Sequence, residues 1–124
     1  MATPVLVVDD DENIGKVFQM GLRCEGVDVV YFSNARDALI WVNRSTPSLA
    51  IVDVVMPEID GVQFCQILRS RRETEALPII LISGIDGAEL KKLASLVGAV
   101  NCVTKPFAPA EVFRLVHSYL GAND

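Results

Sequence analysis

Two apolar runs of the chain end in carboxylates, and these acids are the residues best suited to chemistry. Residues 5–8 lead into Asp9 and Asp10, and residues 49–52 lead into Asp53. Both runs have the length and β-branched content of buried strands, and open α/β sheets bind ligands at the carboxyl ends of their strands. If the strands are neighbours, several acidic oxygens share one pocket and repel one another. A hard divalent cation stabilises such a cluster, so the sequence predicts a site for Mg²⁺ or Mn²⁺.

Two further strand candidates end in groups that can hold phosphate oxygens. Residues 79–82 lead into Ser83 and Gly84, and Lys105 closely follows the strand candidate at 99–103. A carboxylate can attack phosphorus, while a metal ion, an ammonium and a hydroxyl stabilise the charge on the migrating group. The set of side chains at these strand ends therefore indicates phosphoryl transfer to a carboxylate.

The elements that must position these groups alternate along the chain. Strand-like runs alternate with stretches of helical periodicity, and the strand candidates are residues 4–8, 27–32, 49–53, 78–82 and 99–103. This alternation predicts a parallel sheet with helices on both faces. We expect one α/β domain over residues 1–124, a (βα)5 flavodoxin-like doubly wound sheet with strand order 2-1-3-4-5. In that order the first and third strands meet where the winding reverses, which brings Asp10 and Asp53 together.

Several other residues are assigned structural roles. Helix caps are expected at Asp11, Asn34, Asp60 and Asp86. Glycines that follow or end helices are expected at Gly26 and Gly98. The basic residues late in the third helix are interpreted as a solvated face: Arg69, Arg71 and Arg72. His117, the single histidine, is interpreted as a surface or boundary residue.

Composition narrows the class of protein. The chain has a net charge of −5, 51% apolar residues and a pI of about 4.8. Its acidity argues against binding nucleic acid or an anionic membrane through bulk charge. We see no membrane-spanning run and no signal peptide. Cys24, Cys65 and Cys102 form no CxxC pair, so we expect free thiols in a reducing cytoplasm.

The motifs together resemble the receiver domain of two-component response regulators, in the chemotaxis-regulator-like superfamily. The matching segments, in order and evenly spaced over nearly the whole chain, are residues 7–11, 52–61, 82–84 and 105–107. The resemblance implies a phosphorylation-dependent signalling switch that accepts a phosphoryl group from a histidine kinase or phosphotransfer protein. It would signal to a downstream effector through its fourth helix, fifth strand and fifth helix, and catalyse only its own phosphotransfer and dephosphorylation.

The resemblance also implies which residues hold the cation. Asp53 would be the phosphoacceptor. Asp10, Asp53 and the backbone carbonyl of Val55 would be direct ligands of Mg²⁺, and Asp9 would hold metal-bound water.

A second implied group contacts the phosphoryl oxygens. Lys105 would pair with Asp53 and later with those oxygens, aimed inward by a cis Lys105–Pro106 bond. Ser83 would donate a hydrogen bond to one oxygen, and Gly84 would leave room for the group and contact it.

The chain departs from the family pattern on its expected output face. Cys102, three residues before Lys105, stands where many receivers carry an aromatic residue that turns inward on phosphorylation. We therefore expect output through the fourth strand and fourth helix without a ring flip. Val100, Asn101 and Leu115 stand where winged-helix regulators often carry charged dimer contacts, which makes that dimer a poor match.

Aliphatic side chains are expected to flank the phosphoryl site. Val55 and Ile85 would exclude attacking water, so the sequence predicts a long-lived phosphorylated form.

Three other interpretations remain open from the sequence. A degenerate receiver would act as a phosphorylation-independent interaction module. A nucleotide, flavin or cobalamin binder fits poorly, because Gly15-Lys16 lacks the rest of a P-loop and no GxGxxG follows the first strand. A haloacid-dehalogenase-type phosphatase would carry a second Asp where the chain has Val55.

Overall fold

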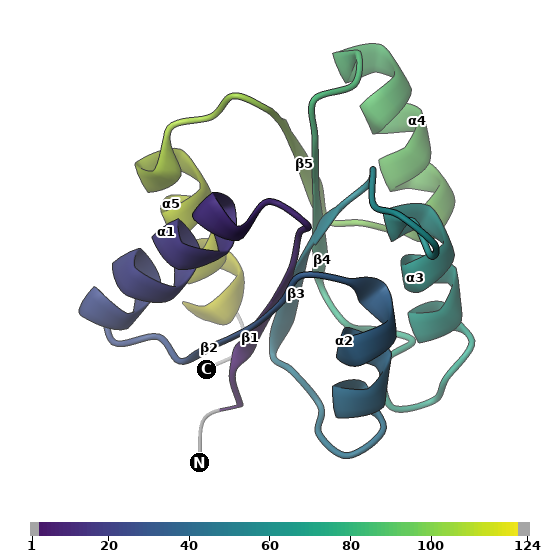
Figure 1. Cartoon of the computed structure of the whole chain (residues 1–124), viewed down its shortest axis with the longest axis horizontal. Helices are drawn as coiled ribbons and strands as arrows, with labels where there is room; N and C mark the ends of the chain where they lie inside the picture. Colours follow the sequence, from purple (N-terminus) through teal and green to yellow (C-terminus); the bar gives the residue numbers. More distant parts are fainter. Residues whose placement is uncertain (1–2, 122–124) are drawn as a thin grey trace.

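The computed structural model describes residues 3–121, in which five strands alternate with five helices (Figure 1). The elements are β1 (Val5–Val8), α1 (Glu12–Cys24), β2 (Val29–Phe32), α2 (Ala35–Val42), β3 (Leu49–Asp53), α3 (Gly61–Arg69), β4 (Ile79–Ser83), α4 (Gly87–Val97), β5 (Asn101–Thr104) and α5 (Pro109–Gly121). All strand pairs are parallel, in the order β2-β1-β3-β4-β5, so the predicted fold class and strand order are confirmed. Residues 1–2 and 122–124 of the expected domain lie outside the described residues.

Helices cover both faces of the sheet, with α1 and α5 on one side and α2, α3 and α4 on the other (Figure 1). Alternate strand residues supply the two apolar layers beneath them. Val5 and Val7 of β1 belong to the layer under α1 and α5, whereas Leu6 and Val8 belong to the opposite layer. The strands β1, β3 and β4 are buried throughout, which explains why they appear in the sequence as unbroken apolar runs.

Four helices begin at the side-chain caps predicted from the sequence. The carboxylate of Asp11 accepts from the Asn13 N–H, and Asn34 accepts from the Asp37 N–H. Asp86 caps α4, and Asp60 forms a reciprocal capping box with Gln63 at the start of α3. Such a cap typically contributes about 1 kcal/mol. The helices therefore begin at fixed points just beyond the strand ends, which restricts the loops that carry the acids.

Two strands begin two residues later than predicted, because the preceding residues close a helix. Gly26 has a φ of 82°, and the Val27 N–H donates to the Leu22 carbonyl to complete the helix ending. The predicted strand at 27–32 is therefore observed as β2 over Val29–Phe32. In the same way, Gly98 ends α4 and the Ala99 N–H donates to Ala94, so β5 begins at Asn101 rather than residue 99.

The interpretation of Arg69 as part of a solvated face is wrong. Its guanidinium donates to the carbonyls of Thr74, Glu75 and Leu77 in the loop after α3, and to those of Val97 and Gly98 at the end of α4. The planar fork of arginine suits several acceptors at once. Arg69 therefore joins the C-terminal ends of α3 and α4 across 28 residues of sequence.

Other sequence expectations concern the surface. His117 is exposed as expected, and its Nε2 lies 2.6 Å from Glu25 Oε1. The three cysteines are free thiols, of which Cys65 is buried and Cys24 exposed. Among the described helices, none combines the length and apolar character required to cross a membrane.

Candidate functional site

The strand ends selected from the sequence lie in one row at the carboxyl edge of the sheet. Val8 pairs with Val52 across β1 and β3, so Asp9 and Asp53 each follow a paired residue on neighbouring strands. On the other side of Asp53, Ser83 of β4 pairs with Thr104 of β5. This register brings the ends of β1, β3, β4 and β5 together, as strand order 2-1-3-4-5 requires.

The acids form a compact cluster. One carboxylate oxygen from each of Asp9, Asp10 and Asp53 lies within 4.8 Å of the others. Asp9 has no exposed surface and Asp53 is only 3% exposed, whereas Asp10 is open to solvent. The cluster is therefore accessible on its Asp10 side and enclosed on the sheet side.

Lys105 supplies the cation of the site. Its ammonium lies 3.0 Å from Asp9 Oδ2 and 3.3 Å from Asp53 Oδ2. The backbone places it there, because the Lys105 N–H donates to the Ser83 carbonyl at 2.7 Å and the expected cis bond to Pro106 is present. Burial alone would lower the pKa of Lys105, but its close contact with the negative charge of Asp9, and then with that of Asp53, raises it overall. Lys105 therefore stays charged between the two acids.

When no metal is bound, the carboxyl group of Asp53 ionises close to physiological pH. Burial and then the charge of Asp9 raise the pKa of Asp53 to about 6, although Lys105 and the Val55 N–H act in the opposite direction. A second cation near Asp53 would favour the ionised, nucleophilic form.

The donor set fits a hard divalent cation. Three carboxylates face one ammonium, which leaves an excess of negative charge at a site lined by oxygens. Asp9 Oδ2 is buried and accepts no well-directed hydrogen bond, although Lys105 lies 3.0 Å away. Its second oxygen accepts from the Asp11 N–H. The cluster therefore has unused acceptor capacity of the kind that Mg²⁺ or its water shell uses.

The expected phosphoryl contacts also lie at this edge. Ser83 is buried at the end of β4, and its Oγ accepts from the Ile85 N–H at 3.3 Å. A side chain at Gly84 would meet nothing within 4 Å, so space is open there. The Val55 N–H donates to Asp53 Oδ1 at 3.4 Å, while the Val55 side chain is 60% exposed at the rim. The roles assigned to these residues stay predictions.

Sequence reasoning missed two residues that shape the site. A Cβ at Gly61 would clash with the carbonyl oxygen of Asp53 and would lie 2.8 Å from Val54 Cα, so only glycine lets α3 start this close. The Asp-Gly pair at 60–61 was the available signal. Tyr31 donates from its hydroxyl to the Asp9 carbonyl at 2.7 Å, and a glycine inside the first helix was the only hint of it.

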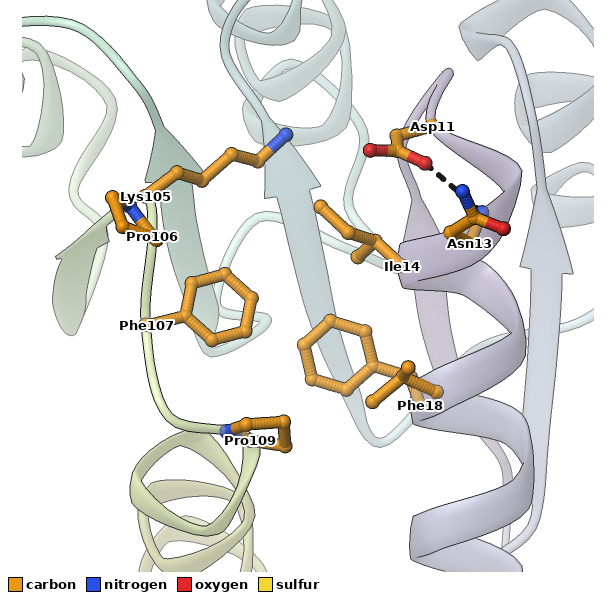
Figure 2. A pocket seen from close by; sticks show the side chains of 9 residues that line it. Asp11, Asn13, Ile14, Phe18, Lys105, Pro106, Phe107 and Pro109 are labelled. Atoms are coloured by element: carbon orange, nitrogen blue, oxygen red, sulfur yellow. Dashed lines mark hydrogen bonds between the residues drawn. The ribbon is translucent and has the colours of Figure 1, made fainter.

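An apolar cavity adjoins the acidic cluster. It has a volume of about 440 Å³ and lies between α1 and the segment that follows β5 (Figure 2). The rings of Phe18 and Phe107 face one another within it, with 5.9 Å between their centroids, and Ile14 and Val17 line the helix side. Lys105 borders the same cavity, so an apolar surface leads directly to the charged site.

On the expected output face, Cys102 occupies the position where many receivers carry an aromatic residue. Cys102 is half-buried and packs against the apolar layer under α2, α3 and α4. Its N–H donates to the Asn101 side-chain oxygen at 2.8 Å. The small thiol offers no ring that could change orientation.

Comparison with known proteins places this geometry in a family. The family described as the response regulator receiver domain matches residues 5–117. The chain is 35% identical to the Bacillus subtilis alkaline phosphatase synthesis transcriptional regulatory protein PhoP over 124 residues, which cover all of this chain and 51% of that protein. It is 29% identical to Pseudomonas aeruginosa Protein PilG, covering 94% of this chain and 86% of that one.

Solved structures of response regulators share this fold. The Vibrio cholerae chemotaxis protein CheY4 superimposes with a TM-score of 0.88 at 26% identity, covering 96% of this chain and 99% of that one. The chain spans about half the length of the first curated relatives that it matches, from 48% to 51%. The family match over 5–117 and the parallel sheet with its acidic edge lead to one assignment: the chain belongs to the response regulator receiver domains of two-component signalling systems.

Proposed function

We propose that this receiver domain is a phosphorylation-dependent switch whose phosphoacceptor is Asp53. The phosphoryl group would come from a histidine kinase or phosphotransfer protein, and Asp10, Asp53 and the Val55 carbonyl would hold Mg²⁺, with Asp9 binding its water shell. The observation that carries the proposal is a buried Asp53 with the Lys105 ammonium at 3.3 Å and two further carboxylates within 4.8 Å.

The transfer itself follows from the chemistry of a carboxylate. An oxygen of Asp53 attacks phosphorus, the P–N bond to the donor imidazole breaks, and the imidazole leaves with the electron pair. Lys105 moves from Asp53 toward the phosphoryl oxygens, because the acyl phosphate carries its charge there. Ser83 donates its hydroxyl hydrogen to one oxygen, and the space beside Gly84 accommodates the group. Bound Mg²⁺ would supply charge stabilisation to the transferring oxygens.

The donor protein is proposed to dock over the apolar cavity beside Lys105. A phosphohistidine must reach Asp53 from the carboxyl edge, and the exposed Val17 of α1 lies on the rim of that cavity. Val17→Glu should slow transfer from a donor protein while labelling by acetyl phosphate stays unchanged. Equal slowing with both donors would remove this assignment.

The effector contact is proposed on the face made by α4, β5 and α5. The thiol of Cys102 fills the usual aromatic position, so motion of β4 and α4 would carry the signal. Amide shifts on phosphorylation that avoid all three elements would contradict this assignment.

The test of the proposed switch uses a small phosphodonor, which removes dependence on an unidentified kinase. Wild type and Asp53→Asn are incubated with acetyl phosphate and Mg²⁺, and intact masses are compared. Wild type should gain one phosphoryl group, and the variant should gain none. An equal mass gain by both proteins would show that the phosphoacceptor is a residue other than Asp53. No gain by folded wild type would favour a degenerate receiver that works as a phosphorylation-independent interaction module.

A further inference from the structure

Tyr31 and Gly15 form a fitted pair beneath the acidic loop. Tyr31 belongs to β2 and packs in the layer under α1, where Gly15 is buried on the facing side of the helix. A Cβ on Gly15 would lie 2.5 Å from Tyr31 Cε1 and Cζ and 2.7 Å from Cδ1. Glycine inside a helix costs about 1 kcal/mol relative to alanine. The glycine therefore has a local reason, which is to make room for the tyrosine ring.

The ring position matters because of the atom at its tip. The Tyr31 hydroxyl donates to the backbone carbonyl of Asp9 at 2.7 Å, and the Asp9 N–H donates to the Phe32 carbonyl at 3.2 Å. Both backbone groups of Asp9 are therefore bonded to adjacent residues of β2.

The hydrogen bond extends the sheet ladder where the ladder stops. The last β1–β2 pair is Val8 with Phe32, after which the chain leaves the sheet toward the helix cap Asn34. The Tyr31 side chain thus holds the first residue of the β1–α1 loop. That loop carries Asp9 and Asp10, two of the three clustered acids.

We propose that Tyr31 is a positioning residue for the cation site: its hydroxyl fixes the β1–α1 loop so that the Asp9 and Asp10 carboxylates face Asp53 before Mg²⁺ binds. Gly15 is required for the same purpose, because any larger residue displaces the ring. The role rests on the proposed function, since it presumes that the cluster binds a divalent cation.

The expected effect is on metal affinity rather than on chemistry. Without the tether, the loop holds the acids in the competent arrangement for a smaller fraction of the time, and the apparent dissociation constant rises in proportion. Loss of one hydrogen bond predicts a rise of about three- to tenfold. Saturating Mg²⁺ should restore the arrangement, so the rate of phosphoryl acceptance from acetyl phosphate should then return close to the wild-type rate.

The test compares Tyr31→Phe, which keeps the ring and removes only the hydroxyl, with Tyr119→Phe. Tyr119 also donates to a backbone carbonyl, that of Val100 at 3.0 Å, on the output face. Mg²⁺ affinity is measured by calorimetry, and folding by far-ultraviolet circular dichroism. Tyr31→Phe should weaken Mg²⁺ binding by about three- to tenfold, whereas Tyr119→Phe should leave it unchanged.

Gly15→Ala provides a second route to the same broken contact. It should weaken Mg²⁺ binding as Tyr31→Phe does, and the double variant should bind no more weakly than the weaker single variant, because both changes remove one hydrogen bond. If wild type binds Mg²⁺ and both Tyr31→Phe and Gly15→Ala bind it with the same affinity, the role of Tyr31 is overturned while the cation site stands. A wild type that binds no Mg²⁺ would overturn the cation site, and with it this role.

Discussion

Lys105 lies closer to Asp9 than to the proposed phosphoacceptor: its ammonium is 3.0 Å from Asp9 Oδ2 and 3.3 Å from Asp53 Oδ2. The lysine therefore shares its single positive charge between two buried acids in the metal-free domain. Any divalent cation that enters the cluster meets a positive charge already bound to the same carboxylates. We therefore expect lysine and metal to compete before phosphorylation, and to act together only when a phosphoryl group adds negative charge.

This competition predicts the effect of removing the lysine charge. Lys105→Met should raise Mg²⁺ affinity roughly tenfold, because about 1.4 kcal/mol of repulsion between cations is lost. The same change should slow phosphoryl acceptance, since the migrating group loses a cation. Calorimetry at pH 8, above the titration of Asp53, measures the first effect, and Lys91→Met on the exposed side of α4 is the control. Unchanged or weaker Mg²⁺ binding by Lys105→Met would show that the lysine does not compete.

The raised pKa of Asp53 predicts a stability that depends on pH. In the folded metal-free domain this pKa is about 6, above the ordinary value of 3.8 for an aspartate, so the folded state holds the proton more tightly. The contribution of Asp53 is therefore fully present below about pH 4 and is lost as pH rises through about 6. Asp53→Asn should be more stable than wild type at pH 7 by on the order of 1–2 kcal/mol, because a pKa unit corresponds to about 1.4 kcal/mol.

Urea unfolding at several pH values checks this dependence. The advantage of Asp53→Asn should disappear near pH 4, and Asp28→Asn at an exposed loop position should show no such trend. Added Mg²⁺ should stabilise wild type more than the variant at pH 7. A variant advantage that grows as pH falls would contradict the assigned sign.

Gly61 is predicted to be indispensable for the geometry around Asp53. Gly61→Ala places a Cβ against the backbone of Asp53 and Val54, which cannot move without distorting β3. We expect a loss of unfolding free energy of about 1–3 kcal/mol, the usual range for overpacking, together with slower phosphoryl acceptance. Gly87→Ala is the matched control, because its Cβ would meet only Thr104 Cγ2 at an ordinary 3.7 Å. Equal stability of both variants would show that α3 can shift freely.

Arg69 is predicted to be a major stabilising side chain. Arg69→Met leaves five carbonyl groups without the guanidinium, and we expect destabilisation of about 2–4 kcal/mol. Arg72→Met, at an exposed position just beyond α3, should change stability by less than about 0.5 kcal/mol. Thermal and urea unfolding measure both. Similar small effects from the two variants would restore the interpretation of Arg69 as a solvated charge.

The phosphorylated form is predicted to be long-lived. Val55 and Ile85 are expected to present aliphatic groups beside the site, and Val55→Asn would offer an amide that can orient water. The variant should lose its phosphoryl group several times faster than wild type after removal of the donor. Following intact mass over time measures this loss. Fast loss by wild type, unchanged in Val55→Asn, would count against shielding.

The fold was largely predictable from the sequence because apolar runs and caps are local signals. The run at 49–53 matches β3 residue for residue, and all four predicted caps form. Val27 and Ala99 were misassigned to strands because an apolar residue after a helix-ending glycine serves the helix, and composition alone does not distinguish the two uses.

The candidate site was predictable where strand ends carry the chemistry. Topology alone brings Asp9, Asp53 and Ser83 to one edge. The contacts of Lys105 with Asp9, of Tyr31 with Asp9 and of Gly61 with Asp53 were not predictable, because each depends on packing between elements distant in sequence. The interpretation of Arg69 was wrong for the same reason, since its acceptors at the end of α4 lie 28 or more residues away in the sequence.

The assignment of Asp53 as phosphoacceptor is tested most sharply by locating the phosphoryl group in the chain. Wild type is phosphorylated with acetyl phosphate and Mg²⁺, the acyl phosphate is reduced with borohydride, and peptides are mapped by mass spectrometry. We predict conversion of Asp53 to homoserine, dependent on Mg²⁺ and accompanied by no conversion of Asp9 or Asp10. Conversion at another aspartate would contradict the role of Asp53, and equal conversion without a divalent cation would contradict the role of Mg²⁺.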